Sequence, residues 1–192
     1  MTSPVDIGNQ ALEFIAAQTT ITALNDGTPA GNAIGVIYLP TVQMLLRQMD
    51  PDFARFTLTT PTLSTGAPPP PWAFAYVYPT DCLRLRQIRP PPGAYDPFDP
   101  QPIVGNVAIL LLSGVPEKAV LTDLANAQFV YTSSAVTENQ WDTLFEQSVV
   151  RQLANPLAMA IAGRPDFARE ILDEAARYEQ ISDLRDESSA QA

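Results

Sequence analysis

Hydrophobic positions follow a helical period at both ends of the chain. Residues 4–17 carry apolar side chains at three- and four-residue spacing, which predicts an amphipathic helix. Ser3 and Pro4 mark its start, because a serine side chain caps free backbone N–H groups and proline is tolerated at the first helical position. Residues 28–49 repeat this pattern with Pro40 inside it. The apolar stripe keeps its phase across this proline, so we expect one kinked helix rather than two shorter helices.

Two further helices are predicted near the C-terminus. Residues 137–140 read TENQ and match a capping box, and an apolar ridge at helical spacing then continues, which predicts a helix over 138–162. A glycine and a proline separate this helix from a last one over 165–183. The final residues, 185–192, are small and polar, and we expect this tail to be flexible.

A period of two replaces the helical period in the middle of the chain. Large aromatic side chains alternate with small apolar ones over 72–78, which predicts a strand covered on both faces. Residues 79–81, Pro-Thr-Asp, form the expected turn into a second strand over 82–88. In this second strand Arg84 and Arg86 lie on one face and two leucines on the other.

Short β-rich runs and proline-rich loops fill the rest of the middle. Residues 107–112, 119–121 and 129–132 are apolar and rich in strand-forming side chains, which predicts a mostly antiparallel sheet. The proline-rich segments 61–71 and 90–102 are typical of stiff, extended spacers. Alternatively, segment 61–71 is a binding motif for a domain that recognises proline-rich peptides.

These elements together predict an α+β fold. Its N- and C-terminal helices, within residues 1–56 and 137–184, are expected to form an antiparallel helical bundle. Residues 57–136 are expected to form a small inserted β subdomain with Pro-rich loops. Residues 185–192 form the flexible C-terminal tail. A chain of this length suits one domain with such an insertion.

Charge and residue types narrow the classes of function. The 192 residues include 21 acidic and 11 basic ones, a net charge of −10, and no histidine. An acidic chain is a poor candidate for gripping phosphate backbones, because that affinity comes from Lys and Arg displacing counterions. The acidic balance serves solubility alone, or it forms a surface past which nucleic acid moves without sticking. The missing histidine removes the commonest general base and the commonest metal ligand.

The single cysteine and the hydropathy pattern bear on the compartment. Cys82 excludes an intrachain disulfide and fits a protein made in a reducing cytoplasm. No apolar run approaches about 18 residues, so we expect no membrane span. The first ten residues lack the basic and apolar regions of a signal peptide.

Candidate chemical groups are few, and each has a structural interpretation. Cys82 is predicted to be a buried packing residue, and Asp81 a turn residue rather than a catalyst. Asp96 and Asp99 lack the spacing of a calcium loop. We therefore expect no catalytic residue, no metal site and no cofactor. Arg84 is expected, with its neighbour Arg86, to form surface or interface ion pairs rather than to bind nucleic acid.

The central segment also carries a resemblance. Residues 72–88 follow the pattern W-x-F-x-Y-x-Y-P-x-D-C-L-R-L-R-x-I, which resembles the head-to-tail adaptors of short-tailed phages, the tail tubular protein A family. The segments 11–27, ending in Leu-Asn-Asp-Gly, and 141–163 are similar to further helices of that family. Residues 49–54 depart from its pattern, since Asp52 stands where the family tends to have tryptophan. The resemblance covers most of the chain.

The resemblance implies a noncatalytic virion protein. Members form a ring, typically of twelve copies, between the portal protein and the tail nozzle, tail tubular protein B, with double-stranded DNA passing through. We expect the protein in the neck of the virion, after assembly in the host cytoplasm, with no membrane partner. Expected portal-binding residues lie in the C-terminal segment: Tyr178, Ile181, Leu184 and Arg185. Expected subunit or nozzle contacts lie in the central strands: Trp72, Phe74, Tyr76, Tyr78, Arg84 and Arg86.

Two other classes of function remain open. A carboxylate-based cell-wall hydrolase of a phage tail needs two acids at a set separation across a groove, which the sequence does not reveal. A head completion connector of the long-tailed phage type would have the same ring role with a different tail.

Overall fold

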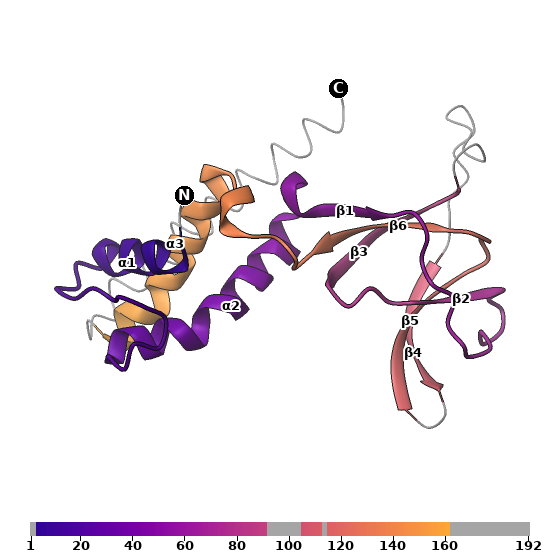
Figure 1. Cartoon of the computed structure of the whole chain (residues 1–192), viewed down its shortest axis with the longest axis horizontal. Coiled ribbons are helices and arrows are strands. Elements are labelled where there is room, and N and C mark those ends of the chain that lie inside the picture. Colours follow the sequence, from indigo (N-terminus) through magenta and orange to yellow (C-terminus); the bar gives the residue numbers. More distant parts are fainter. Residues whose placement is uncertain (1–2, 92–104, 113–114, 162–192) are drawn as a thin grey trace. The chain divides into compact units, whose positions relative to one another are not determined.

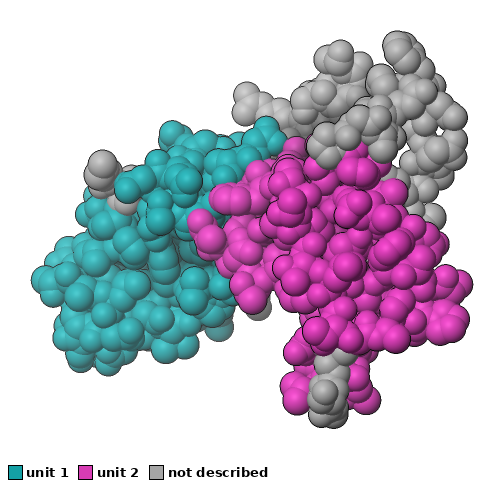
Figure 2. All heavy atoms as spheres, turned by 45° about the vertical axis from the view of Figure 1, so that its right-hand side comes forward, with its two compact units in different colours: residues 1–53, 136–192 teal, residues 54–135 magenta. Residues whose placement is uncertain are grey.

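The computed structural model describes residues 3–91, 105–112 and 115–161, and the chain divides into two compact units (Figures 1 and 2). Unit 1 comprises residues 1–53 and 136–192, and unit 2 comprises residues 54–135. The helices of unit 1 are α1 (Pro4–Phe14), α2 (Pro29–Met49) and α3 (Thr143–Ala160), with short 3-10 helices η1 (Asp52–Ala54) and η2 (Glu138–Gln140) beside them. The strands of unit 2 are β1 (Arg55–Leu58), β2 (Phe74–Val77), β3 (Cys82–Arg89), β4 (Gly105–Leu112), β5 (Val115–Thr122) and β6 (Gln128–Ser133).

The first two helices begin where the sequence predicts. The Ser3 side chain accepts a hydrogen bond from the Asp6 backbone N–H, and Asp6 returns one, so a full capping box opens α1. The Thr28 hydroxyl likewise caps α2 by accepting from the Gly31 N–H at 3.0 Å. Helix α2 continues through Pro40 to Met49 as one unbroken helix. Both predicted starts are confirmed.

The predicted start of the third helix is wrong by five residues. The capping box of Thr137 and Gln140 is present, but it closes only the single 3-10 turn of η2. Trp141 is extended, with φ −71° and ψ 143°. Asp142 then caps α3, because its Oδ1 accepts from the Phe145 N–H at 2.7 Å. The apolar pattern alone predicts one helix here. Two successive caps, at Thr137 and Asp142, instead divide the segment into η2 and α3.

The predicted fold class is also wrong in its architecture. A mixed α+β composition is consistent with the structure, but an antiparallel bundle of N- and C-terminal helices is not shown. Helix α3 packs on both α1 and α2, whereas α1 and α2 make only a minor contact with each other. The predicted last helix, 165–183, lies outside the described residues. The strands form two three-stranded sheets, a division that the sequence did not predict.

The two sheets of unit 2 are antiparallel and share one hydrophobic core. Their strand orders are β1-β6-β3 and β2-β5-β4, so the neighbouring strands β2 and β3 belong to different sheets. Tyr76 of one sheet meets Phe129 of the other edge-to-face, with ring centroids 5.5 Å apart. Val120 and Ile88 are buried in the same cluster. The turn predicted at 79–81 therefore passes the chain from one sheet to the other.

Two pairings involve segments that the sequence did not predict to be strands. Residues 55–58, expected to be a connection, form β1 and pair with β6. Part of the proline-rich segment lies beside β2, because the Val77 N–H donates to the Thr62 carbonyl and the Ser64 N–H to the Ala75 carbonyl, both at 2.8 Å. This part of the segment is thus hydrogen-bonded to the edge of the sheet and is more than a spacer.

Candidate functional site

Asp81 lies within the sequence pattern of residues 72–88, in the turn between β2 and β3, and its carboxylate is hydrogen-bonded to side chains of β6. The Tyr131 hydroxyl donates to both carboxylate oxygens at 3.2 Å, and the Ser133 hydroxyl donates to Oδ2. The Ser134 N–H donates to the Asp81 carbonyl at 2.8 Å. The carboxylate is thus held by side chains of a neighbouring strand, and its geometry is that of a structural clamp.

We expect Asp81→Asn to destabilise unit 2. The amide is a weaker acceptor than a carboxylate and turns one donor toward the hydroxyls, so we expect a loss of about 2 kcal/mol in the free energy of unfolding. Urea unfolding of a Trp141→Phe background, in which Trp72 is the only tryptophan and lies in unit 2, measures this loss. Addition of Tyr131→Phe should then cost less than it does in the Asp81 protein. Full additivity of the two changes would contradict the clamp.

Raised tyrosine pKa values predict a loss of stability at high pH. Burial, reinforced by the nearby Asp81 carboxylate, raises the pKa of Tyr131 to about 12. Burial also raises the pKa of Tyr38, whose hydroxyl donates to Glu138 Oε1 at 3.0 Å. Tyrosine in an unfolded chain has a pKa of about 10, so the unfolded state loses its proton first. The stabilisation is complete below about pH 10 and is lost as the pH rises toward about 12.

The matching measurement is the urea midpoint at several pH values between about 9 and 12. We expect the unit 2 midpoint, read from Trp72 in the Trp141→Phe background, to fall over this range. The additional change Tyr131→Phe should flatten that fall, because it removes the titrating phenol. Equal slopes with and without Tyr131 would show that the raised pKa does not contribute to stability.

The remaining motif residues divide between the core and the surface. Tyr76 is buried, and its hydroxyl donates to the Leu124 carbonyl at 3.0 Å, so this predicted contact residue belongs to the core. Phe74, Tyr78 and Trp72 are half-buried. Cys82 is buried as predicted, and burial raises the pKa of its thiol. The Lys118 ammonium lies 3.7 Å from the centroid of the Tyr78 ring.

Four arginines share the outer face of the sheet β1-β6-β3, which we call the arginine face. Two bulges in β3 shift its register, so that Ile88 turns into the core beside Phe129 while the arginines lie opposite. Thr132 pairs with residues of both neighbouring strands, and the Arg86 Nε donates to its hydroxyl at 2.8 Å. The members of the arginine face are Arg55, Arg84, Arg86 and Arg89.

The net charge of the chain resides in one unit. Unit 1 contains sixteen acidic and six basic residues, whereas unit 2 contains five of each. Unit 1 therefore carries the whole formal charge of −10, and unit 2 is neutral. The net charge of the whole chain hides this asymmetry, which a count by predicted subdomain reveals.

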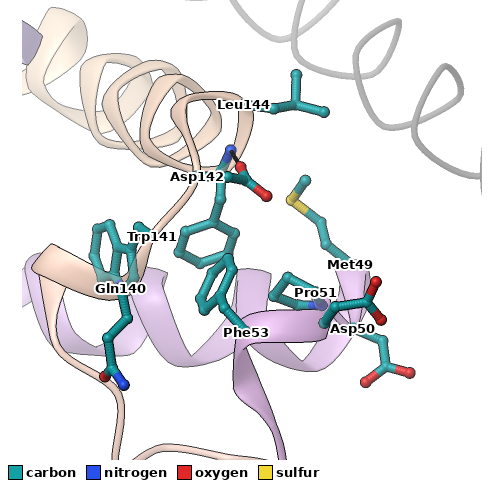
Figure 3. A pocket seen from close by; sticks show the side chains of 10 residues that line it. Met49, Asp50, Pro51, Phe53, Gln140, Trp141, Asp142 and Leu144 are labelled. Carbon is teal, nitrogen blue, oxygen red and sulfur yellow. Dashed lines mark hydrogen bonds between the residues drawn. The ribbon is translucent and has the colours of Figure 1, made fainter.

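A hollow of about 400 Å³ lies in unit 1 between the end of α2 and the start of α3 (Figure 3). Phe145 is fully buried at its base and contacts Phe53 and Trp141 edge-to-face, with ring centroids 5.3 and 4.9 Å apart. Three carboxylates add negative charge to the lining, and none of the lining residues is basic. We call this feature the acidic aromatic hollow, lined by Met49, Asp50, Pro51, Asp52, Phe53, Gln140, Trp141, Asp142, Leu144 and Phe145.

Two observations bear on what the hollow can bind. Within the described part of the chain, no group of three or more Asp, Glu, Cys or His residues is placed to hold a metal ion. The indole Nε1 of Trp141 is buried and has no hydrogen-bond acceptor among the described residues. The hollow thus presents carboxylates and aromatic rings, which suit a cationic group. No local sequence pattern predicts this site, because its residues come from two segments far apart in the chain.

Among the described residues of unit 2, the hairpin of β4 and β5 carries the most exposed large apolar side chains. Strand β4, Gly105–Leu112, forms one edge of its sheet and contains no charged residue and no proline. Ile109 and Leu111 are 71% and 75% exposed, and Val115 is 58% exposed. Proteins usually protect such edges with charges, prolines or covering elements. Strand β4 itself contains neither of these protective residue types, and an exposed apolar edge is typical of a surface that meets another protein.

Several expectations from the sequence are not addressed by the structure. The expected portal-binding residues, Tyr178, Ile181, Leu184 and Arg185, lie outside the described residues, as do Asp96 and Asp99. In the described parts of the chain, no helix has both the length and the apolar character needed to cross a membrane. Comparison with models of known protein families found no match, and comparison with curated proteins found none either.

Proposed function

We propose that this protein is a noncatalytic, ring-forming connector of a phage virion, placed between the portal and the tail. The proposal starts from the resemblance of residues 72–88 to head-to-tail adaptors of short-tailed phages. The structural observation that supports it best is the β4–β5 hairpin, with its uncharged edge strand and its exposed Ile109 and Leu111. A subunit that functions inside an assembly needs such a surface.

The distribution of charge supports the same proposal. Copies in a ring lie close together, and like charges facing each other across an interface oppose assembly. The neutral unit 2 avoids this repulsion, while the acidic unit 1 offers a surface to which a DNA phosphate backbone does not bind. A channel for DNA needs passage without retention, and an acidic wall provides it.

The experiment that tests this proposal measures mass with and without the portal. Purified protein mixed with portal rings should form a stoichiometric cap on one end of the portal, visible by electron microscopy and by native mass spectrometry. Truncation after Arg177 should weaken that cap, because it removes the whole expected docking segment, residues 178–192. A protein that never binds portal rings and never associates with itself would overturn the connector role.

A hydrolase remains the second candidate because three carboxylates line one hollow. Asp50 and Asp52 follow α2, and Asp142 precedes α3. One of them, Asp142, already caps α3 through its Oδ1. Release of soluble fragments from purified peptidoglycan, lost in Asp52→Asn, would support this candidate. Equal, background-level release by wild-type protein and variant would dismiss it.

A further inference from the structure

We propose that the free edge of β4 pairs with β4 of a second copy of this chain, antiparallel, about a two-fold axis at Ile109. Two sheets of order β2-β5-β4 then join edge to edge into one continuous sheet. The inference does not depend on the connector role, because it concerns the subunit before any larger assembly forms. It assigns an occupant to the backbone edge, whereas the proposed function uses only the exposed side chains of the hairpin.

The pairing of β5 with β2 fixes which way the backbone groups of β5 point. In an antiparallel strand the N–H and C=O groups of one residue point to the same side, and the side alternates from each residue to the next. The Lys118 carbonyl accepts from the Tyr78 N–H at 3.2 Å, on the side of β2. The backbone groups of Ala119 therefore point to the other side, toward β4, where its partner is Ala108.

The outward backbone groups of β4 follow from the same alternation. The groups of Ala108 point to β5, so those of Val107, Ile109 and Leu111 point away from the sheet. The pairing with β5 runs through Gly105–Leu112 without a bulge, so the alternation holds along the whole strand. Strand β4 is the last strand of its sheet among the described residues (Figure 1). A row of evenly spaced donors and acceptors is thus offered to a further strand.

The other side of the same hairpin is protected. Strand β2 pairs only with Ala119–Thr122, so the part of β5 before Ala119 is also an edge. Pro116 points the same way as Lys118, away from β4, and proline has no N–H to offer there. Glu117 and Lys118 add charges beside it. Proteins use these two devices to prevent strand pairing, and β4 contains neither of them.

The remaining edges in the described part of unit 2 suit β4 less well than a second β4 does. The free side of β2 is already hydrogen-bonded to Thr62 and Ser64. Strand β1 has only four residues, and β3 contains two bulges and three arginines. Bulges interrupt the row of backbone groups that pairing needs. A second β4 has the same eight residues, no bulge and no charge, so like can face like without repulsion.

The direction of the backbone groups limits the register of the pair. Outward groups must face outward groups, so Ile109 can lie opposite Ile109 of the second copy but not opposite its Ala108. In this register Val107 lies opposite Leu111, and branched apolar side chains meet across the junction. A shift that places Ile109 opposite Val107 would leave Leu111 opposite Gly105, which has no side chain to pack.

A two-fold pair has a consequence for assembly. Such a contact uses the same patch on both copies and is complete with two of them. In a connector the pair is therefore the form that precedes the ring, and each copy covers the apolar hairpin of the other until ring or portal contacts replace it.

Cysteine crosslinking tests the contact and its register. In a Cys82→Ala background, Ile109→Cys should form a disulfide between copies under mild oxidation, because opposite residues of such a pair have Cα atoms about 5.5 Å apart. Val36→Cys in α2 is the matched control, since Val36 and Ile109 are both 71% exposed. Non-reducing electrophoresis should show the crosslinked dimer at least about ten times faster for Ile109→Cys than for Val36→Cys.

A proline variant separates backbone pairing from side-chain contact. Ile109→Pro removes an N–H that points away from β5, so the hairpin keeps its own hydrogen bonds, and proline is tolerated at such edge positions. We expect the Kd of the dimer to rise at least about tenfold. Ile109→Ala keeps the N–H and should raise the Kd less. Sedimentation equilibrium measures both variants, and circular dichroism checks their folding.

Each outcome supports or overturns the pairing. Crosslinking through Ile109→Cys with the larger loss in Ile109→Pro supports it, and crosslinking decides alone if the proline variant is misfolded. Faster crosslinking of Val36→Cys places the contact on α2, and equal effects of proline and alanine show a contact without strand pairing; both overturn it. A subunit that is monomeric alone but caps portal rings overturns the pairing and leaves the connector role intact. A β4 dimer that never binds portal rings counts against the connector role alone.

Discussion

Replacement of Ile109 and Leu111 by aspartate is expected to abolish assembly while leaving the subunit folded. Both side chains are largely exposed, so unit 2 loses little packing when they change. Each buried apolar side chain of this size contributes about 1.5–3 kcal/mol to an interface, and a buried unpaired carboxylate costs more. The expected loss of affinity for each subunit contact is therefore at least about a hundredfold.

The measurement is the mass distribution by native mass spectrometry, with circular dichroism to confirm folding. Val36→Asp with Leu39→Asp provides the matched control, because these α2 residues of unit 1 are similarly exposed, at 71% and 59%. Loss of assembly in the hairpin variant alone would assign the interface to unit 2. Loss in the α2 variant alone would transfer it to unit 1 and remove the main support for the proposed surface.

Phe145→Ala is expected to be the most destabilising single change in unit 1. Phe145 is fully buried beside Phe53 and Trp141, and removal of a buried phenylalanine side chain costs about 3–5 kcal/mol. Urea unfolding in a Trp72→Phe background reports on unit 1, because Trp141 is then the only tryptophan. The midpoint should fall sharply.

Phe129→Ala is the matched change in the core of unit 2. It removes the same atoms from an equally buried position, so its cost should be similar but should be detected from Trp72 rather than Trp141. A shift of the Trp141 transition by Phe129→Ala would show that the two units unfold together. A small effect of Phe145→Ala on the Trp141 transition would mean that the base of the hollow collapses into the vacated space.

Local signals were predictable from the sequence where a single segment carries them. Ser3 with Pro4 and Thr28 with Pro29 mark helix starts through contacts within one turn, and both are confirmed. Asp142 also caps a helix, but the capping box just before it is a stronger local pattern, so the predicted start was misplaced. Neighbouring signals of the same kind compete, and here the extended backbone of Trp141 separates the two capped turns.

Longer-range features were not predictable, because they depend on which segments meet. The bulge between Leu85 and Gln87 in β3 brings Arg84 and Arg89 to one face, whereas a strict period of two would place residues five positions apart on opposite faces. The hollow needs the end of α2 and the start of α3, which are about ninety residues apart. The failure of the bundle prediction has the same origin, since helical periodicity does not specify how helices cross.

The insertion of unit 2 within unit 1 has a consequence for synthesis on the ribosome. Unit 2 is one continuous segment, so it is complete when its last residue leaves the exit tunnel. Helices α1 and α2 pack mainly on α3, which is translated some hundred residues later. Helices α1 and α2 therefore wait with their apolar faces uncovered until α3 has been translated.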